Sequence, residues 1–218
     1  MVKVTFQLNE DKTFNLDPTK IIFISFLSLI IIGTILLSLP IASVDGKSVG
    51  LFNALFTATS ATCVTGLVVV DTATQWTLFG QLVILSLIQI GGLGLITFAT
   101  FFSILLGKKV GIKAKVLAQE SLNHFSFHGI LKLIKRVVLV TFGIELIGAV
   151  LLSISFVPKF GPKGLFMGLF HSISAFCNAG FDIMGNFNSF IGYNNNPLVI
   201  YTFALLIITG GLGFMVWK

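Results

Sequence analysis

The chain has 218 residues, of which 55% are hydrophobic and 10% are charged, and its mean hydropathy is +1.00. A soluble domain carries about 25% charged residues, so most of this surface must face lipid. The same composition excludes a disordered chain, and two cysteines are too few for a disulfide framework. These figures are typical of an integral membrane protein.

The first apolar run follows a polar segment, residues 1–20, that we expect to be a cytoplasmic N-terminus. The run covers residues 21–39 and is ended by Pro40. About 20 helical residues cross the hydrocarbon core, whereas the apolar part of a signal peptide has about 7–15. We therefore predict a membrane-spanning helix and not a cleaved leader.

Three further stretches are predicted to span the membrane: residues 78–106, 137–157 and 198–217. Pro158 is expected to end the middle one, and Glu145 lies inside it. An ionised acid at mid-membrane costs about 2.5–3.5 kcal/mol on insertion scales. Glu145 is thus either part of an ion path or pH sensor, or a protonated or hydrogen-bonded acid packed inside the bundle, which we favour.

Two apolar segments, residues 51–61 and 165–176, are too short to span. If helical, each crosses about half the bilayer, and each precedes small, polar or glycine residues at 62–66 and 177–181. Non-helical backbone at membrane depth must be buried in protein or line a wet cavity. Both segments are therefore predicted to be re-entrant loops, with a half-helix entering and an extended strand leaving.

The same pieces occur twice, in the same order. The matching pairs are Leu51 with Leu165, Phe52 with Phe166, Leu55 with Leu169, Phe56 with Phe170, Cys63 with Cys177, Gly66 with Gly180, and Pro40 with Pro158. Such long-period self-similarity indicates a structural repeat. We predict an all-α polytopic membrane protein with two repeats of helix, re-entrant pore loop and helix, at 21–106 and 137–218, joined by a basic linker at 107–136.

The basic residues predict the orientation. Seven of the fourteen lie between Lys108 and Arg136, which is typical of a cytoplasmic loop and much less of a nucleic-acid patch. Three more, Lys3, Lys12 and Lys20, precede the first span, whereas segments 41–76 and 158–196 hold only Lys47, Lys159 and Lys163. We expect a multi-pass protein of the cell membrane with both termini cytoplasmic, no nucleic-acid partner, and both re-entrant loops entering from outside.

Re-entrant loops of this kind can bind and stabilise a cation within the membrane. A half-helix directs the partial negative charge of its carbonyl end at the bilayer centre, and rings of backbone carbonyls replace a potassium ion's hydration shell. Glycine at positions 66 and 180 would permit the backbone dihedrals that turn neighbouring carbonyls one way. Thr62 and Thr65 could add hydroxyl oxygens, and His171 is expected to pack behind the second strand.

Three motifs carry a family resemblance. They are Ser60-Ala61-Thr62-Cys63-Val64-Thr65-Gly66-Leu67, Ile88-Gln89-Ile90-Gly91-Gly92-Leu93-Gly94, and Phe170-His171-x-Ile173-Ser174-Ala175-Phe176-x-Asn178-Ala179-Gly180-Phe181. The chain resembles the Trk/Ktr/HKT superfamily of potassium transporters along essentially its whole length. Within it, the membrane subunit of bacterial Ktr systems is most similar.

The resemblance implies a potassium-uptake subunit with a carbonyl selectivity filter. Potassium is then the substrate and the only metal bound, sodium is a coupling ion in many members, and the chain binds no cofactor. The expected filter residues are Val64, Thr65, Gly66, Asn178, Ala179 and Gly180, flanked by Thr62, Cys63, Cys177 and Phe181. The implied partners are membrane lipid and a separate cytosolic nucleotide-binding regulatory ring. Glycine rather than serine at position 66 points to potassium over sodium.

Two features depart from the family pattern. Cys63 and Cys177 stand where relatives often have Thr and Asn, a change that leaves the backbone carbonyls in place. Family members also carry four repeats, and this chain has two. Either it is part of a longer protein, or two copies pair as a homodimer or larger assembly; a non-conducting assembly module is the alternative function.

The remaining candidates have plainer explanations beside the functional ones. Asp71 and Asp182 follow the two filter strands, where they either concentrate cations at the outer mouth or cap turns. The inner-helix glycines more plausibly allow close packing than nucleotide binding, because they lie in membrane helices; they are Gly91, Gly92, Gly94, Gly210, Gly211 and Gly213. His124 and His128 lack a third metal ligand nearby. No hydrolase motif is present, so we predict that the chain is not an enzyme.

Overall fold

The computed structural model describes residues 4–7, 13–16, 18–105, 115–118 and 130–212. Most of the predicted linker, the histidines at 124 and 128 and the glycine at 213 lie outside these ranges. The described residues are largely helical, with one exception that the sequence did not predict. Strands β1 (Val4–Gln7) and β2 (Thr13–Leu16) pair antiparallel in the polar N-terminal segment, with Phe6 opposite Phe14.

The first half of the chain follows the predicted order of helices. It consists of α1 (Pro18–Ser38), the 3-10 turn η1 (Pro40–Ala42), α2 (Leu51–Thr62), the short α3 (Thr72–Gln75), α4 (Leu78–Leu93) and α5 (Leu95–Leu105). Proline does end the first helix, since Pro40 opens the turn that follows α1. Proline suits that first position because it lacks the N–H that a continuing helix would need.

The predicted helix at 78–106 is wrong as a single element. It divides at Gly94, whose φ of 79° lies in the left-handed region that glycine tolerates. The Gly94 N–H turns back to the carbonyl of Gly91, and α5 starts at the next residue. The break leaves α4 with 16 residues and α5 with 11.

The second half contains α7 (Ile130–Phe160), α8 (Lys163–Phe176), the 3-10 turn η2 (Ile191–Tyr193) and α9 (Pro197–Gly211). The 31 residues of α7 begin inside the range predicted as linker. Pro158 does not end this helix, contrary to expectation, but lies inside its last turn. The end comes at Gly161, which has a φ of 61° and donates its N–H to Val157.

Among the residues that the structure describes, two helices are long and apolar enough to cross a membrane, Thr19–Ser38 and Leu131–Phe160, with mean hydropathies of 2.7 and 2.5. Helices α4 and α9 are apolar but shorter, and the last residues of the predicted fourth span lie outside the described ranges. The structure therefore gives two of the four predicted spans their full length.

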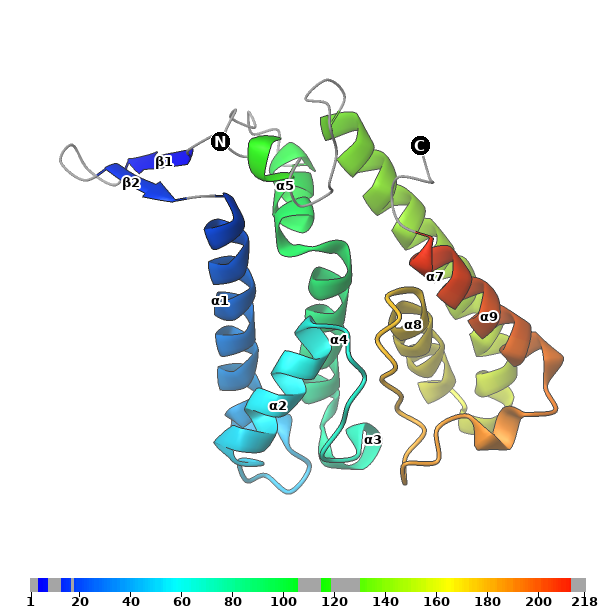
Figure 1. The fold of residues 1–218 in the computed structure, drawn as a ribbon. Helices are drawn as coiled ribbons and strands as arrows, with labels where there is room; N and C mark the ends of the chain where they lie inside the picture. Colours follow the sequence, from blue (N-terminus) through cyan, green and yellow to red (C-terminus); the bar gives the residue numbers. More distant parts are fainter. Residues whose placement is uncertain (1–3, 8–12, 17, 106–114, 119–129, 213–218) are drawn as a thin grey trace.

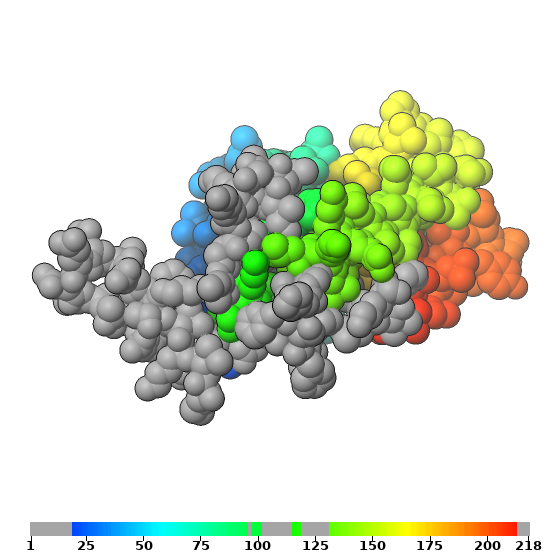
Figure 2. Space-filling view, turned by 90° about the horizontal axis from the view of Figure 1, so that it is seen from above, coloured from blue at the N-terminus to red at the C-terminus, as the bar shows by residue number. Residues whose placement is uncertain are grey.

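The two halves lie side by side (Figures 1 and 2). The hairpin, α5 and the start of α7 are at one end of the molecule, at the top of Figure 1, and α3 and the end of α7 are at the other. A shared core joins the halves, with Leu37, Ile84 and Ile88 from the first and Leu152, Phe156 and Phe170 from the second. Large apolar side chains also cover the outside, including Phe23, Ile31, Ile35, Leu146, Ile147 and Leu205. Such a surface is stable against lipid rather than water.

Candidate functional site

Helix α2 ends in a tight backbone turn. The N–H of Val64 donates to the carbonyl of Ala61 at 3.4 Å, and the N–H of Thr65 donates to Ser60 at 3.0 Å. This pair of bonds is the Schellman arrangement, in which the residue after the cap is left-handed. Val64 occupies that position with a φ of 58°. A β-branched side chain is strained in this region. The surrounding structure must therefore hold Val64 in a backbone conformation that valine disfavours.

Helix α8 ends in the same way. The N–H of Asn178 donates to Ala175 at 3.0 Å, and the N–H of Ala179 donates to Ser174 at 2.7 Å. Asn178 has a φ of 57°, which asparagine tolerates better than valine. Each donor and acceptor is the repeat-equivalent of one at the end of α2, so the two helix ends share one backbone geometry.

The two segments that leave these helices meet at their glycines. Gly66 and Gly180 have φ values of 74° and 71°. A Cβ on Gly66 would lie 2.6 Å from the carbonyl oxygen of Ala179 and 3.2 Å from the Cα of Gly180. A Cβ on Gly180 would lie 3.4 Å from the Cα of Gly66. Backbone thus contacts backbone at this point, and the contact leaves no room for a side chain on Gly66.

Glycines of α4 and α9 press against the two helix ends. A Cβ on Gly91 would collide with the carbonyl of Thr62, the last residue of α2. A Cβ on Gly210 would collide with the carbonyl of Phe176, the last residue of α8. Gly92 is less tight, because its Cβ would lie 2.7 Å from a side-chain atom, the Sγ of Cys177. Helices α4 and α9 therefore pack directly against the backbone of the two turns.

Looser surroundings are found at Gly211, where a Cβ would make only an ordinary contact of 3.8 Å with the Asn178 amide. Gly94, as described, ends α4.

The thiols of Cys63 and Cys177 are both free. No group of three or more potential His, Cys, Asp or Glu ligands occurs within the described part of the chain.

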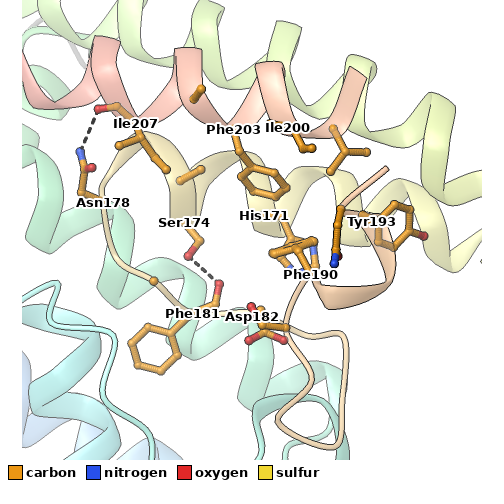
Figure 3. Close-up of a pocket in the computed structure, with 16 residues that line it drawn as sticks. His171, Ser174, Asn178, Phe181, Asp182, Phe190, Tyr193, Ile200, Phe203 and Ile207 are labelled. Atoms are coloured by element: carbon orange, nitrogen blue, oxygen red, sulfur yellow. Dashed lines mark hydrogen bonds between the residues drawn. The ribbon is translucent and has the colours of Figure 1, made fainter. Parts of the chain in front are cut away.

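The second segment is fixed by side chains of α8 (Figure 3). His171 is fully buried, and its Nδ1 lies 2.7 Å from the carbonyl of Met167 while its Nε2 accepts from the N–H of Ile183 at 3.0 Å. Since Nε2 accepts, the ring proton is on Nδ1 and donates to Met167. The hydroxyl of Ser174 donates to the carbonyl of Phe181 at 2.6 Å. The sequence predicted that His171 packs behind the second segment, but it did not predict the hydrogen bond between His171 and that segment.

The first segment lacks these bonds. Thr57 takes the place of His171, and its buried hydroxyl has no hydrogen-bond partner among the described residues. The same is true of Thr62, whereas Thr65 is paired with Ser60 at 2.8 Å between hydroxyl oxygens. The two repeats therefore share a backbone but differ in how firmly side chains hold it.

Asp71 joins the two halves beyond the first segment. Its Oδ1 accepts from the N–H groups of Ala73 and Thr74, both at 2.9 Å, and so caps α3. Its Oδ2 accepts from the N–H of Phe187 in the second half at 2.8 Å. Partial burial raises the pKa of Asp71, but these hydrogen bonds outweigh burial and bring its pKa below the ordinary value.

Asp182 behaves differently. Its Oδ1 accepts from the N–H of Met184 at 2.9 Å. Burial raises the pKa of Asp182, and the negative charge of Asp71 raises it further, against the effect of the Met184 bond. The two carboxylates are thus near enough to interact, and Asp71 is the more readily ionised.

A cavity of about 570 Å³ lies between α8, α9 and the segment that follows α8 (Figure 3). Its wall is mostly apolar, with Phe190, Ile200 and Phe203 among the lining residues. The Asn178 amide turns toward α9 and donates to the carbonyl of Ile207 at 3.4 Å.

Comparison with known proteins identifies the family of the chain. Residues 5–218 match the family model described as TrkH, cation transport protein. The chain belongs to the TrkH family. The matching model describes cation transport proteins, and the similar proteins are cation transporters rather than enzymes, which confirms the predicted family resemblance.

Relatives within the family are closely similar. The Ktr system potassium uptake protein B of Bacillus subtilis (strain 168) is 49% identical over 214 residues, covering 96% of this chain and 47% of the relative. The protein of that name from Vibrio alginolyticus is 43% identical over 207 residues, covering 94% and 44%. The potassium/sodium uptake protein NtpJ of Enterococcus hirae is 42% identical over 204 residues, covering 93% and 45%. The chain spans about half the length of these relatives.

Proposed function

We propose that the chain supplies two of the strands that line a potassium pathway through the cell membrane. The observation that carries the proposal is the meeting of Gly66 with Gly180 directly after two helices that end in the same left-handed turn. Potassium is the proposed cargo because the names of the similar proteins specify potassium uptake.

In this proposal α2 and α8 are the half-helices of two re-entrant loops. Their carbonyl ends carry partial negative charge toward the interior of the membrane, which favours a cation there. Backbone carbonyls at positions 64–66 and 178–180 then replace the water around potassium. Thr62, Cys63, Cys177 and Phe181 flank this filter without lining it. Left-handed residues at both turns are what allow neighbouring carbonyls to point the same way.

A closed filter of four strands needs two more than this chain provides. They come either from further repeats of a longer polypeptide or from a second copy in a dimer. We also propose a cytosolic nucleotide-binding ring as regulatory partner, since two of the relatives are named as parts of a Ktr system. Sodium is the proposed coupling ion; the relative from Enterococcus is named for both potassium and sodium.

The proposed orientation places the starts of α1 and α7 in the cytoplasm. Both helices begin at the same end of the molecule (Figure 1). The first turns of α7 carry Lys132, Lys135 and Arg136. Basic residues concentrate on the cytoplasmic side of membrane proteins. Asp71 and Asp182 then lie at the outer mouth, where their charge can concentrate cations.

The test is potassium uptake in a host that lacks its own uptake systems. The chain is expressed alone, and also fused to the remaining half of a similar full-length relative, each as native sequence and as Gly66→Ser. We expect uptake from the native fusion, and loss of uptake or gain of sodium permeation in the Gly66→Ser fusion. Gly46→Ser is the matched control, because Gly46 also has a positive φ of 65° but open space around it.

Uptake by the chain alone would mean that copies pair into a working filter. If the native fusion reaches the membrane and conducts no potassium, the chain is an assembly module and the filter proposal is wrong. Equal effects of the two serine variants would also contradict it, because the contact between the glycines would then have no special role.

A further inference from the structure

Three helices meet at Glu145, an acid of α7 that is 2% exposed. From α4, the Nε2 of Gln89 donates to the Oε1 of Glu145 at 3.0 Å. From α8, the hydroxyl of Ser172 donates to the backbone carbonyl of Glu145 at 2.6 Å. Because α4 belongs to the first half and α7 and α8 to the second, this buried cluster joins the two halves in the apolar interior.

Two oxygens of the cluster have no partner among the described residues. They are the Oε2 of Glu145 and the Oε1 of Gln89, both buried. An unpaired buried acceptor is destabilising, and an unpaired buried charge is far more so. A carboxylate at this point would therefore carry a large penalty unless a positive group faced it.

Within the part of the chain that the structure describes, the helices around Glu145 offer no positive group to face it. The sequences of α4 and α9 contain no ionisable side chain other than Tyr201 of α9, which is exposed. In α8 the lysine is the first residue, at 163, and both ring nitrogens of His171 are already bonded. The basic residues of α7 itself lie toward its two ends.

We propose that Glu145 is a proton-binding site, with the proton on Oε2 donated to Gln89 Oε1 to form a carboxylic acid–amide pair. One proton then satisfies both unpaired oxygens and removes the buried charge. Turning the amide by 180° would place Gln89 Oε1 against Glu145 Oε1, and two oxygens at that separation also need a proton between them. Both orientations of the amide therefore lead to the same protonation state.

A metal cation fits this site less well. A hard cation such as calcium or magnesium takes about six oxygen ligands or more, and the pair offers only two unpartnered oxygens. The proton is also the smallest ligand, and Gln89 and Glu145 are already in contact. The inference uses only the packing of α4, α7 and α8, so it does not depend on which ion the protein carries.

The test uses infrared spectroscopy of the purified protein in lipid bilayers at neutral pH. We expect a protonated-carboxyl C=O band in the wild type that is absent in Glu145→Gln. Gln89→Leu should keep the band but move it to higher frequency, because the carboxyl loses its hydrogen-bond partner. A wild-type spectrum that differs from Glu145→Gln only in carboxylate bands would overturn the proposal, as would a band unmoved by Gln89→Leu.

Thermal unfolding provides a second and independent readout. Glu145→Gln replaces the acid by an amide that can also donate to Gln89 Oε1, so its unfolding midpoint should stay near that of the wild type. Glu145→Leu should lower the midpoint, since it leaves both polar groups of Gln89 unpaired. If sodium chloride raised the midpoint of the wild type more than that of Glu145→Gln at equal ionic strength, the site would bind a cation and not a proton.

Discussion

The Nε2 of His171 accepts a hydrogen bond at 3.0 Å from the backbone N–H of Ile183, twelve residues along the chain. The bond ties the far end of the second extended segment to the middle of α8. At the equivalent place in the first repeat, Thr57 has a buried hydroxyl without a partner among the described residues. The second segment is thus the better fixed of the two, and side chains rather than the common backbone account for the difference.

Replacing His171 by Phe should release this segment while keeping the aromatic packing. The His171 ring contacts Phe156 and Phe190 edge-on, at centroid distances of 5.7 and 4.8 Å, and a phenyl ring can keep those contacts. The lost bond leaves the N–H of Ile183 unpaired, at a cost of about 1–3 kcal/mol. The control is Thr57→Val, which removes an unpaired hydroxyl and should leave stability unchanged or improved. Unfolding midpoints in detergent check both, and equal losses would contradict the assigned role.

Gly66→Ala should cost more than Gly46→Ala. Both glycines have positive φ, for which a non-glycine residue pays about 1–2 kcal/mol in backbone strain. Only at Gly66 does the new methyl meet backbone, since Gly46 has nothing within 4 Å. The difference in unfolding free energy between the variants therefore isolates the contact with Ala179. No difference would mean that the two segments can move apart without cost.

The close packing of α4 on α2 and of α9 on α8 can be tested with three alanine variants. Gly143 of α7 has open space around it, so Gly143→Ala should stabilise its helix by up to about 1 kcal/mol. Gly91→Ala and Gly210→Ala place the same methyl against a backbone carbonyl and should destabilise by about 1–3 kcal/mol. Unfolding in detergent measures all three, and stabilisation in each would show that the helices are free to separate.

Asp71→Asn should destabilise the protein in a pH-dependent manner. The pKa of Asp71 is lowered from 3.8 in the folded state, so its ionised form adds stability that is present above that value and lost as the pH falls through the folded pKa. At neutral pH we expect a loss of about 1 kcal/mol, because asparagine can still cap α3 through one oxygen but no longer offers a second oxygen to the N–H of Phe187. Unfolding midpoints measured from neutral to acidic pH should show the wild type and variant converging at low pH.

Asp182→Asn should show the opposite trend. The pKa of Asp182 is raised from 3.8, so ionising it costs stability as the pH rises through the window between 3.8 and the folded pKa. In the same series, the stability of the variant relative to that of the wild type should therefore increase as the pH rises. Parallel curves for wild type and variant would contradict the raised pKa of Asp182.

Neutralising Asp71 and Asp182 together tests the outer-mouth proposal. If their charges concentrate cations, the double variant Asp71→Asn/Asp182→Asn should lose more potassium flux at low ionic strength than at high, because salt screens the attraction. The measurement uses the conducting fusion described above. Equal losses at both ionic strengths would show that the two acids act only through the turns that they cap.

The sequence alone determined the membrane character, the order of the helices and the twofold repetition. Apolar length and the placement of basic residues are local properties, readable without knowing which helices touch. The short helices were predicted at 51–61 and 165–176 and found at Leu51–Thr62 and Lys163–Phe176. Their ends were predictable because the polar and glycine residues that follow cannot continue an apolar helix.

Helix ends that depend on one backbone dihedral were not predictable. The sequence predicted an unbroken helix through Gly94 and an end at Pro158, yet α4 stops before Gly94 and α7 runs past Pro158. Glycine tolerates both helical and left-handed dihedrals, and a proline within a helix removes one backbone hydrogen bond but does not always end the helix. Which outcome occurs is settled by packing against other helices.

Only the tertiary structure decided which residues meet. Gly66 touches Gly180, His171 binds the backbone of Ile183, and Glu145 pairs with Gln89, although each pair is separated in the sequence. These contacts depend on how α2, α4, α7 and α8 are placed in space. A repeat in the sequence shows that two segments have the same local form, but their mutual approach is set by the packing of the helices that carry them.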